Sequence, residues 1–372
     1  MLQGREISNS ALQLDALDGL RGIAVLLVFL SHTSLNGDHL IPFVDFSGVG
    51  KSGVFLFFLL SAFLLTKPFL VKERDQVDKR FLLNYAQRRF FRIYPLYFTF
   101  LGAALLLSFF VPQGPRGHAY PFPLVYSGFL DHLLLQEGKG VTWSILVEFR
   151  YYFVLPILAL FFSLVLHNRL LPCTILTLVL VALTQVFWPE AASHRNDVRL
   201  QPYLPIFFMG SFLAVLHHQL SESKLRDTVW LQNVIEVVGF GAIMVLILMI
   251  PSVTSMFVGG GVPTDFFHRQ FMLYGLLWSF VLLAGISGRG WLKWCFEIRV
   301  LRYVGFISFS VYLLHAPVID VIKLFNLSQL LNPWLMLAVT IAVSHTTWML
   351  IEKPLSGIRF IRPAEPSPVK SV

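Results

Sequence analysis

The chain is short of charge and nearly lacks cysteine. Of its 372 residues, 13% are charged and two are cysteine, whereas 56% are hydrophobic. Soluble domains carry about 25% charged residues, so this composition excludes an ordinary soluble globular protein. With only Cys173 and Cys295, a disulfide framework is excluded as well. No His, Cys and carboxylate group has metal-ligand spacing, and we expect no bound metal.

Internal repeats and long polar linkers are also missing. We find no period of roughly 20 to 50 residues, the signature of repeat folds. The one biased stretch is a short proline-rich cytoplasmic tail at about 356–372. The sequence therefore predicts a single transmembrane domain over residues 1–372.

Apolar segments of membrane-spanning length are abundant. Ten of them approach the ~20 residues that cross a bilayer as a helix. They lie at residues 17–35, 53–71, 93–111, 145–166, 170–187, 203–217, 233–251, 270–287, 304–324 and 333–351. The first is followed by no small-residue cleavage site, so we expect a retained helix rather than a signal peptide. The predicted fold is an all-α polytopic membrane protein, a bundle of about ten transmembrane helices.

The distribution of positive charge predicts the orientation. Lys and Arg total 29, against 21 Asp and Glu. Most of the Lys and Arg, including those in the segment 72–92, lie in loops and helix ends on the same side of the membrane as the two chain termini. Because cytoplasmic loops carry the excess of Lys and Arg, we expect both termini in the cytoplasm and the loop 112–143 outside. This rule explains the net charge of +8 without a nucleic acid partner.

Three ionisable residues fall inside predicted spans at similar depth. His32, Glu148 and His315 lie in the outer halves of the first, fourth and ninth segments. Ionisable side chains within a membrane need a partner or water and are functional candidates. The alternative is a structural role for each, satisfied by a backbone carbonyl or a neighbouring hydroxyl.

Arg21 shares a helical face with His32. Eleven residues turn a helix by roughly 1100°, about 20° beyond three turns, and rise by roughly 16 Å. Arg21 at one surface would therefore leave His32 well inside the membrane. Asp18, three residues before Arg21, is a candidate ion-pair partner.

A second cluster of charge lies in the sequence RRFFR. Arg89 and Arg92 are three residues apart, which places them on one helical face at the inner surface. Paired guanidinium groups suit phosphates, although positive-inside anchoring explains them equally well. Pro95 is expected to stop or bend the helix just after this pair.

Five blocks follow one another along the chain: LDGLRGIAVLLVFLSH, SGVFLFFLLSAFLL, RRFFRIYPLY, WSILVEFRYYFVLP and ISFSVYLLHAPV. In this order they resemble the membrane acyltransferase-3 family. The first block carries the family's arginine, ten residues and histidine, at Arg21 and His32. The fourth block carries Trp143, Ser144 and Glu148, and the fifth is followed by IEKPLSGIR. Ala62 stands where the second block usually has glycine. No esterase-like region is evident, so the chain resembles the stand-alone transmembrane form.

The resemblance implies an O-acyltransferase of the bacterial inner membrane. It implies transfer of an acyl group, often acetyl, from cytoplasmic acyl-CoA (acetyl-CoA) to a hydroxyl of an envelope carbohydrate or another acceptor. His32 is then the general base, for which a neutral imidazole is suited, and Glu148 its candidate partner. Arg89, Arg92 and Arg21 would hold the donor, and Trp143, Ser144, Asp18 and His315 would support the site.

Two other functions fit the same residues. Buried His, Glu and Arg also build proton-coupled transporters of small molecules, although no half-to-half symmetry is apparent here. An unrelated multi-span O-acyltransferase would centre similar chemistry on His315 rather than on His32.

Overall fold

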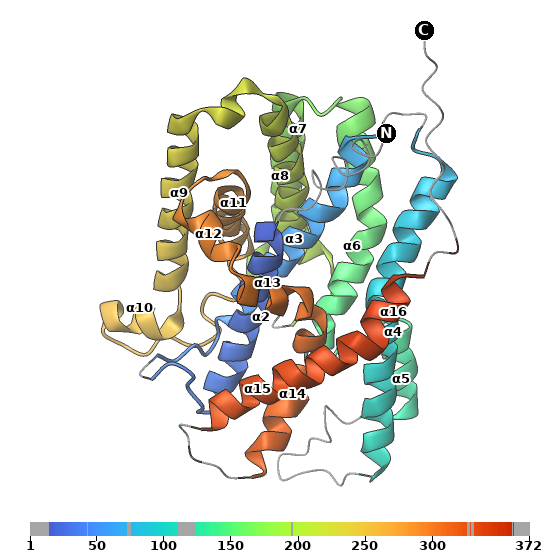
Figure 1. Cartoon of the computed structure of the whole chain (residues 1–372), viewed down its shortest axis with the longest axis vertical. Coiled ribbons are helices and arrows are strands. Elements are labelled where there is room, and N and C mark those ends of the chain that lie inside the picture. Colours follow the sequence, from blue (N-terminus) through green and yellow to red (C-terminus); the bar gives the residue numbers. More distant parts are fainter. Residues whose placement is uncertain are drawn as a thin grey trace.

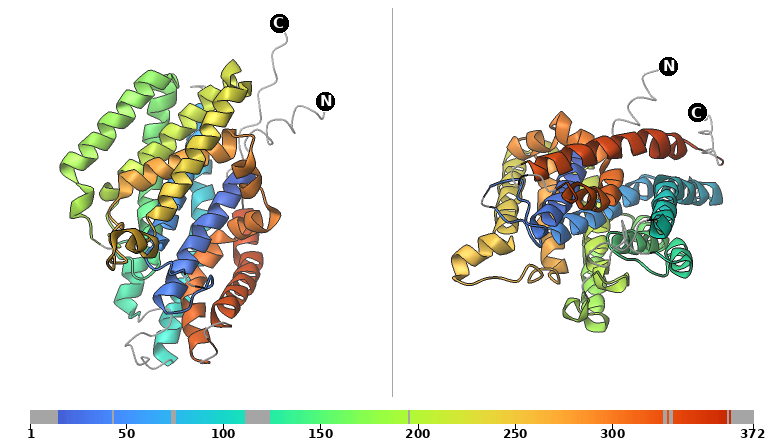
Figure 2. Two further views of the ribbon diagram at one scale, coloured as in Figure 1. Left: turned by 90° about the vertical axis from the view of Figure 1, so that its left-hand side faces the viewer. Right: turned by 90° about the horizontal axis from the view of Figure 1, so that it is seen from below.

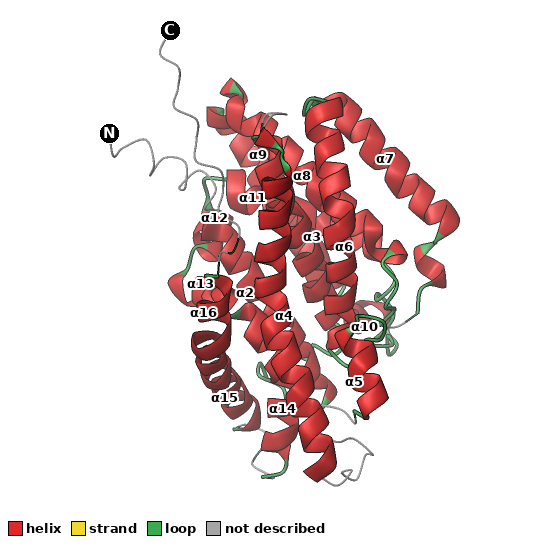
Figure 3. Ribbon diagram, turned by 90° about the vertical axis from the view of Figure 1, so that its right-hand side faces the viewer, coloured by secondary structure: helices red, strands yellow, loops and turns green. Residues whose placement is uncertain are grey.

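The computed structural model describes residues 15–42, 44–72, 76–110, 124–194, 196–325, 328, 331–358 and 360. Within these residues the chain forms helices and no strands (Figure 3). The long helices are α2 (Asp15–Leu35), α3 (Gly50–Leu70), α4 (Lys79–Phe110), α6 (Thr142–Leu160), α7 (Leu170–Phe187), α8 (Leu204–Glu222), α9 (Val229–Leu248), α11 (Phe271–Ser287), α14 (Ser308–Lys323) and α15 (Asn332–Thr347). The short ones are α5 (Tyr126–Leu133), α10 (Pro251–Val258), α12 (Trp291–Phe296), α13 (Arg299–Phe306) and α16 (Lys353–Ser356).

The predicted membrane bundle is confirmed. Eight helical segments of the described chain are long and apolar enough to cross a membrane, and the bent pair α13 and α14 makes a ninth. The remaining predicted span is α11, which is apolar but has only 17 residues. Figures 1 and 2 show the long helices running side by side around a central group that includes α2, α3 and α11. Most of the proline-rich tail lies outside the described residues.

Helix α4 differs from the prediction at its start. It begins at Lys79 rather than near residue 93, and it continues through Pro95 to Phe110. The helix therefore does not stop at Pro95, and the other expected outcome, a bend there, stays a prediction. Membrane helices tolerate proline because neighbouring groups satisfy the freed backbone carbonyl. As a result, Arg89 and Arg92 lie inside a continuous helix.

The ninth predicted span is broken. Its first part, α13, meets α14 at a bend of 78° near Ile307. Because α13 carries Arg299 and Arg302, crossing the hydrocarbon as a straight continuation of α14 would bury two charges. Instead Arg302 forms an ion pair of 2.5 Å with Asp15 at the start of α2.

Glycines bring α13 and α12 against α2. A Cβ atom at Gly305 would lie 1.7 Å from the carbonyl oxygen of Asp18, and one at Gly19 would lie 1.8 Å from the carbonyl oxygen of Phe296. Small residues allow this close backbone contact between membrane helices. The packing fixes the first turns of α2, which carry Arg21.

Candidate active site

Two cavities lie on either side of one tyrosine in the bundle. The histidine cavity, of about 100 Å³, is lined by His32, Lys51, Trp143 and Asn196 among others. The arginine cavity, of about 70 Å³, is lined by Arg21, Arg89, Arg92, Ser144 and Glu148 among others. Val54 and Tyr312 line both cavities. The face of α2 that carries Arg21 and His32 therefore reaches one cavity at each end.

His32 and His315 are in direct contact. Nδ1 of His32 lies 3.1 Å from Nε2 of His315, and the ring centroids are 4.9 Å apart. Nδ1 of His32 is also 2.9 Å from the carbonyl oxygen of Val28, and Nδ1 of His315 is 3.2 Å from that of Val311. Carbonyl oxygens only accept, so each Nδ1 carries a proton in neutral rings. The lone pair of His32 is then on Nε2.

Tyr312 joins α14 to α6 at the boundary of the two cavities. Its hydroxyl lies 2.6 Å from Oγ of Ser144 and donates to the carbonyl oxygen of Val141 over 3.0 Å. Both side chains are buried. The predicted supporting residue Ser144 thus holds the tyrosine that separates His32 from the arginines.

The arginine cavity brings together the three predicted arginines. Arg21 forms an ion pair of 3.0 Å with Asp18, as predicted. Arg89 and Arg92 both line this cavity, so their three-residue spacing does place them on one face. Nε of Arg89 is buried without a hydrogen-bond partner in the described part of the chain. An unsatisfied guanidinium nitrogen beside two further arginines favours an anionic ligand.

Glu148 lies with the arginines rather than beside His32. Its Oε1 accepts hydrogen bonds from Ser61 over 2.5 Å and from Tyr152 over 2.7 Å. It also lines the arginine cavity, where it interacts electrostatically with Arg89. His315 is in direct contact with His32, and the pairing of His32 with Glu148 stays a prediction.

Trp143 and Lys51 form one wall of the histidine cavity. Nζ of Lys51 lies 3.9 Å from the Trp143 ring centroid, a cation–π contact, and it also donates a hydrogen bond to Asn196. Trp143 is buried and packs against Tyr203 and Phe58. The predicted supporting residue Trp143 thus shapes this wall.

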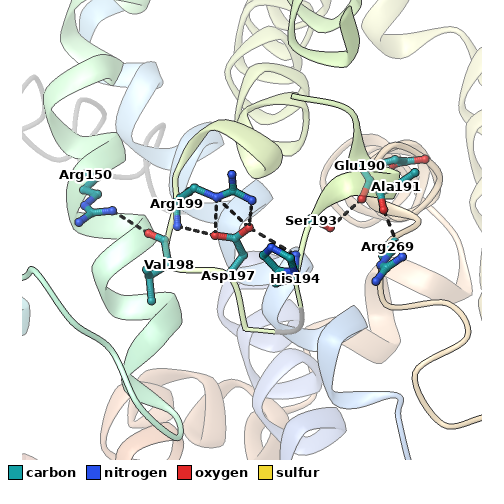
Figure 4. Close-up of polar contacts among 9 residues, drawn as sticks. All are labelled: Arg150, Glu190, Ala191, Ser193, His194, Asp197, Val198, Arg199 and Arg269. Carbon is teal, nitrogen blue, oxygen red and sulfur yellow. Dashed lines mark hydrogen bonds and ion pairs between the residues drawn. The ribbon is translucent and has the colours of Figure 1, made fainter. Parts of the chain in front are cut away.

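The loop between α7 and α8 carries Asn196 to the cavity and is held at several points (Figure 4). Arg150 of α6 donates to the carbonyl oxygens of Val198 and Leu135 over 2.8 and 3.2 Å. Arg269 donates to that of Ala191 over 3.1 Å. These hydrogen bonds connect the loop to two other segments and hold it in place beside the histidine cavity.

An internal ion pair stiffens the same loop. The Arg199 side chain donates to the Asp197 carboxylate with distances of 2.6 to 3.0 Å (Figure 4). Burial acts to raise the pKa of Asp197, but hydrogen bonds from the side chain and backbone of Arg199 outweigh it and lower that pKa below its ordinary value. The carboxylate therefore stays charged and paired at neutral pH.

Several residues of the two cavities were not predicted, among them Tyr152, Ser61, Tyr312 and Lys51. Tyr152 follows Glu148 by four residues, so helical spacing alone could have suggested it. Ser61, Tyr312 and Lys51 come from other helices, and no spacing in the sequence indicates their contacts. The same holds for the meeting of His32 with His315, which are 283 residues apart.

Comparison with known proteins assigns the chain to a family. The family model described as an acyltransferase domain matches residues 14–352, which include every cavity residue named above. The chain belongs to the acyltransferase-3 family. The protein is therefore an acyltransferase, as the five sequence blocks predicted. No solved structure matches this acyltransferase.

Its relatives include bacterial O-acetyltransferases. The peptidoglycan O-acetyltransferase OatA of Listeria monocytogenes is 25% identical over 378 residues, which cover 93% of this chain and 56% of OatA. BcsY of Komagataeibacter xylinus, named a membrane-bound transacylase, is 26% identical over 91% of this chain and 81% of its own. A Staphylococcus aureus protein named an O-acetyltransferase is 25% identical, with 91% and 56% covered. This acyltransferase thus spans about half the length of OatA and of the Staphylococcus protein.

Proposed function

We propose that this membrane O-acyltransferase moves an acetyl group from cytoplasmic acetyl-CoA to a hydroxyl of an envelope glycan. The observation that carries the proposal is the pair of cavities that share Tyr312 and Val54. One is lined by three arginines, and the other is lined by His32, which His315 contacts. Donor binding and proton transfer would then take place on opposite sides of Tyr312, within a bacterial inner membrane.

The arginine cavity would receive the phosphates of the donor. Coenzyme A carries several phosphate charges, and bidentate Arg contacts are well suited to them. Arg89 supports this role because its buried Nε has no hydrogen-bond partner within the described residues. The levels of Arg21 and His32 differ by roughly 16 Å along α2. An extended thioester arm would cover this distance past Tyr312.

The histidine cavity would carry out the chemistry. The acceptor hydroxyl gives its proton to Nε2 of His32 while its oxygen attacks the thioester carbonyl. The new C–O bond forms, the C–S bond breaks, and the proton passes from His32 to the sulfur that leaves as coenzyme A. His315 would act as a positioning residue, since its Nε2 lies beside the proton on Nδ1 of His32.

The test uses the purified full-length protein with acetyl-CoA and the glycan fraction of the cell envelope. Wild type is expected to release coenzyme A and to acetylate the glycan, measured by mass spectrometry. His32→Ala should lower transfer by roughly a hundredfold or more, the usual contribution of a general base. His39→Ala is the matched control, because His39 is an exposed histidine that lines neither cavity.

His315→Ala separates the two histidines. We expect a smaller loss than in His32→Ala together with a shifted pH profile of the remaining activity, because His32 loses the neighbour of its Nδ1 proton. Normal transfer by folded His32→Ala would contradict the proposed chemical centre. In that event a complete loss in His315→Ala would move the general base to His315.

A further inference from the structure

A third cavity, the largest of the three, lies where α3 and α8 end and α9 begins. This lysine cavity has a volume of about 580 Å³ and is lined by residues of α3, α8, α9 and α11 and of adjoining segments. Lys67, Arg226 and Lys293 bring three basic side chains to it, and His217 and His218 add two imidazoles. None of these residues lines the histidine or the arginine cavity.

The charge in the lysine cavity is not neutralised. Glu222 is the single carboxylate among the described lining residues, and its Oε1 lies 3.5 Å from Nε2 of His218. Nζ of Lys67 is buried without a hydrogen-bond partner in the described chain, and the residue is only 9% exposed. The centroid of the Phe63 ring lies 5.7 Å from Nζ. A buried ammonium without a carboxylate is costly unless a ligand supplies the counter-charge.

Most of the remaining lining is apolar. Seven of the sixteen lining residues are Leu, Ile or Val, from Leu70 and Val71 at the end of α3 to Ile235 on α9 and Ile286 on α11. Helix α9 stands at the edge of the bundle in Figure 1, and large apolar side chains on it such as Val234 and Val237 are exposed. A ligand with a phosphate and an acyl chain would match both parts of this lining.

We propose that the lysine cavity binds an anionic phospholipid, with its headgroup phosphate on Lys67 and its acyl chains toward α9. Basic pockets between membrane helices on the cytoplasmic side are known to hold anionic headgroups. In the predicted orientation this end of the bundle is cytoplasmic. The site is additional to the arginine cavity and does not depend on which donor or acceptor the enzyme uses.

The experiment measures lipid binding to the purified, delipidated full-length protein by isothermal titration calorimetry. The probes are short-chain phosphatidylglycerol, phosphatidylcholine with the same chains, inorganic phosphate and coenzyme A. Wild type is expected to bind phosphatidylglycerol more tightly than phosphatidylcholine. Lys67→Met should weaken phosphatidylglycerol binding by about tenfold to a hundredfold, the effect of losing one charge-assisted hydrogen bond.

Lys72→Met is the matched control, because Lys72 is an exposed lysine five residues further along the chain. It should bind phosphatidylglycerol like wild type. Lipid-free Lys67→Met should unfold at a temperature no lower than wild type, because methionine replaces an unpaired buried ammonium with an apolar chain of similar length. If Lys67→Met unfolds earlier, Lys293→Gln takes its place and should show the same loss of binding.

Two results would overturn the proposal. One is equal phosphatidylglycerol binding by wild type and by the cavity variants. The other is a competition result with inorganic phosphate or coenzyme A. If either one displaces phosphatidylglycerol from wild type and no longer binds to Lys67→Met, the site serves a soluble phosphate ligand instead of a lipid.

Discussion

The surroundings of Arg89 and Arg92 in the fold distinguish between two roles that their spacing in the sequence leaves open. Their spacing in the sequence is compatible with phosphate binding and with simple anchoring of a membrane helix. In the structure both line a cavity together with Arg21, and Nε of Arg89 is buried without a hydrogen-bond partner among the described residues. Anchoring arginines would instead point toward lipid headgroups or water. The cavity therefore favours the phosphate role.

The double change Arg89→Ala and Arg92→Ala should reduce the affinity for a non-transferable acetyl-CoA analogue by at least tenfold. Each charge-assisted contact contributes roughly 1.5 to 3 kcal/mol, so two lost contacts exceed one order of magnitude. Changing both residues to Lys should recover only part, because the charge returns without the planar fork. Equilibrium binding to the purified variants measures this, with His32→Ala expected to bind like wild type. Unchanged binding by the double-Ala variant would remove the arginine pair from donor recognition.

At the scale of helices, the sequence predicts where a helix is present better than it predicts whether that helix is continuous. All ten apolar segments coincide with helices, because the length and hydropathy of a span follow from local composition. The 78° bend at Ile307 was missed because α13 turns only in response to α2, with its close contact at Gly305 and its ion pair from Arg302. The meeting of His32 and His315 was missed for the same reason. Contacts between helices depend on packing that no single segment encodes.

Gly305 gives an element-scale prediction. Gly305→Ala would place a methyl group against the backbone of α2 at Asp18, where nothing flexible can yield. We expect a loss of about 1 to 3 kcal/mol of stability, the typical cost of overpacking. Gly241→Ala on α9 is the control, since a Cβ there meets nothing within 4 Å. Thermal unfolding in detergent should separate the two variants, and equal midpoints would mean that α13 is free to move away from α2.

For the whole molecule, orientation is the property that assigns each cavity to a compartment. The positive-inside rule predicts that the loop 112–143 faces out and that the segment 72–88 faces the cytoplasm. Gln136 and Lys79 are exposed residues in these two regions. In a background with Cys173 and Cys295 changed to Ser, Gln136→Cys should react with an impermeant thiol reagent in intact cells, and Lys79→Cys should react only after lysis. The reverse pattern would place the arginine cavity on the outer side and exclude cytoplasmic acetyl-CoA as its ligand.

The length of α4 determines how far the arginine cavity lies from the charged surface of the membrane. Its 32 residues span about 48 Å, whereas the hydrocarbon core of a bilayer is about 30 Å thick. Phe109 and Phe110 are apolar and exposed at one end, so the surplus length falls at the charged end that begins at Lys79. Arg89, about 15 Å from that end, then lies at the depth of the headgroups. Acetyl-CoA, the proposed donor, is polyanionic and would have to cross the negative surface potential of the leaflet to reach this level. On the proposed function, we expect the supply of donor to fall as the leaflet gains anionic lipid and to recover as salt screens the surface potential.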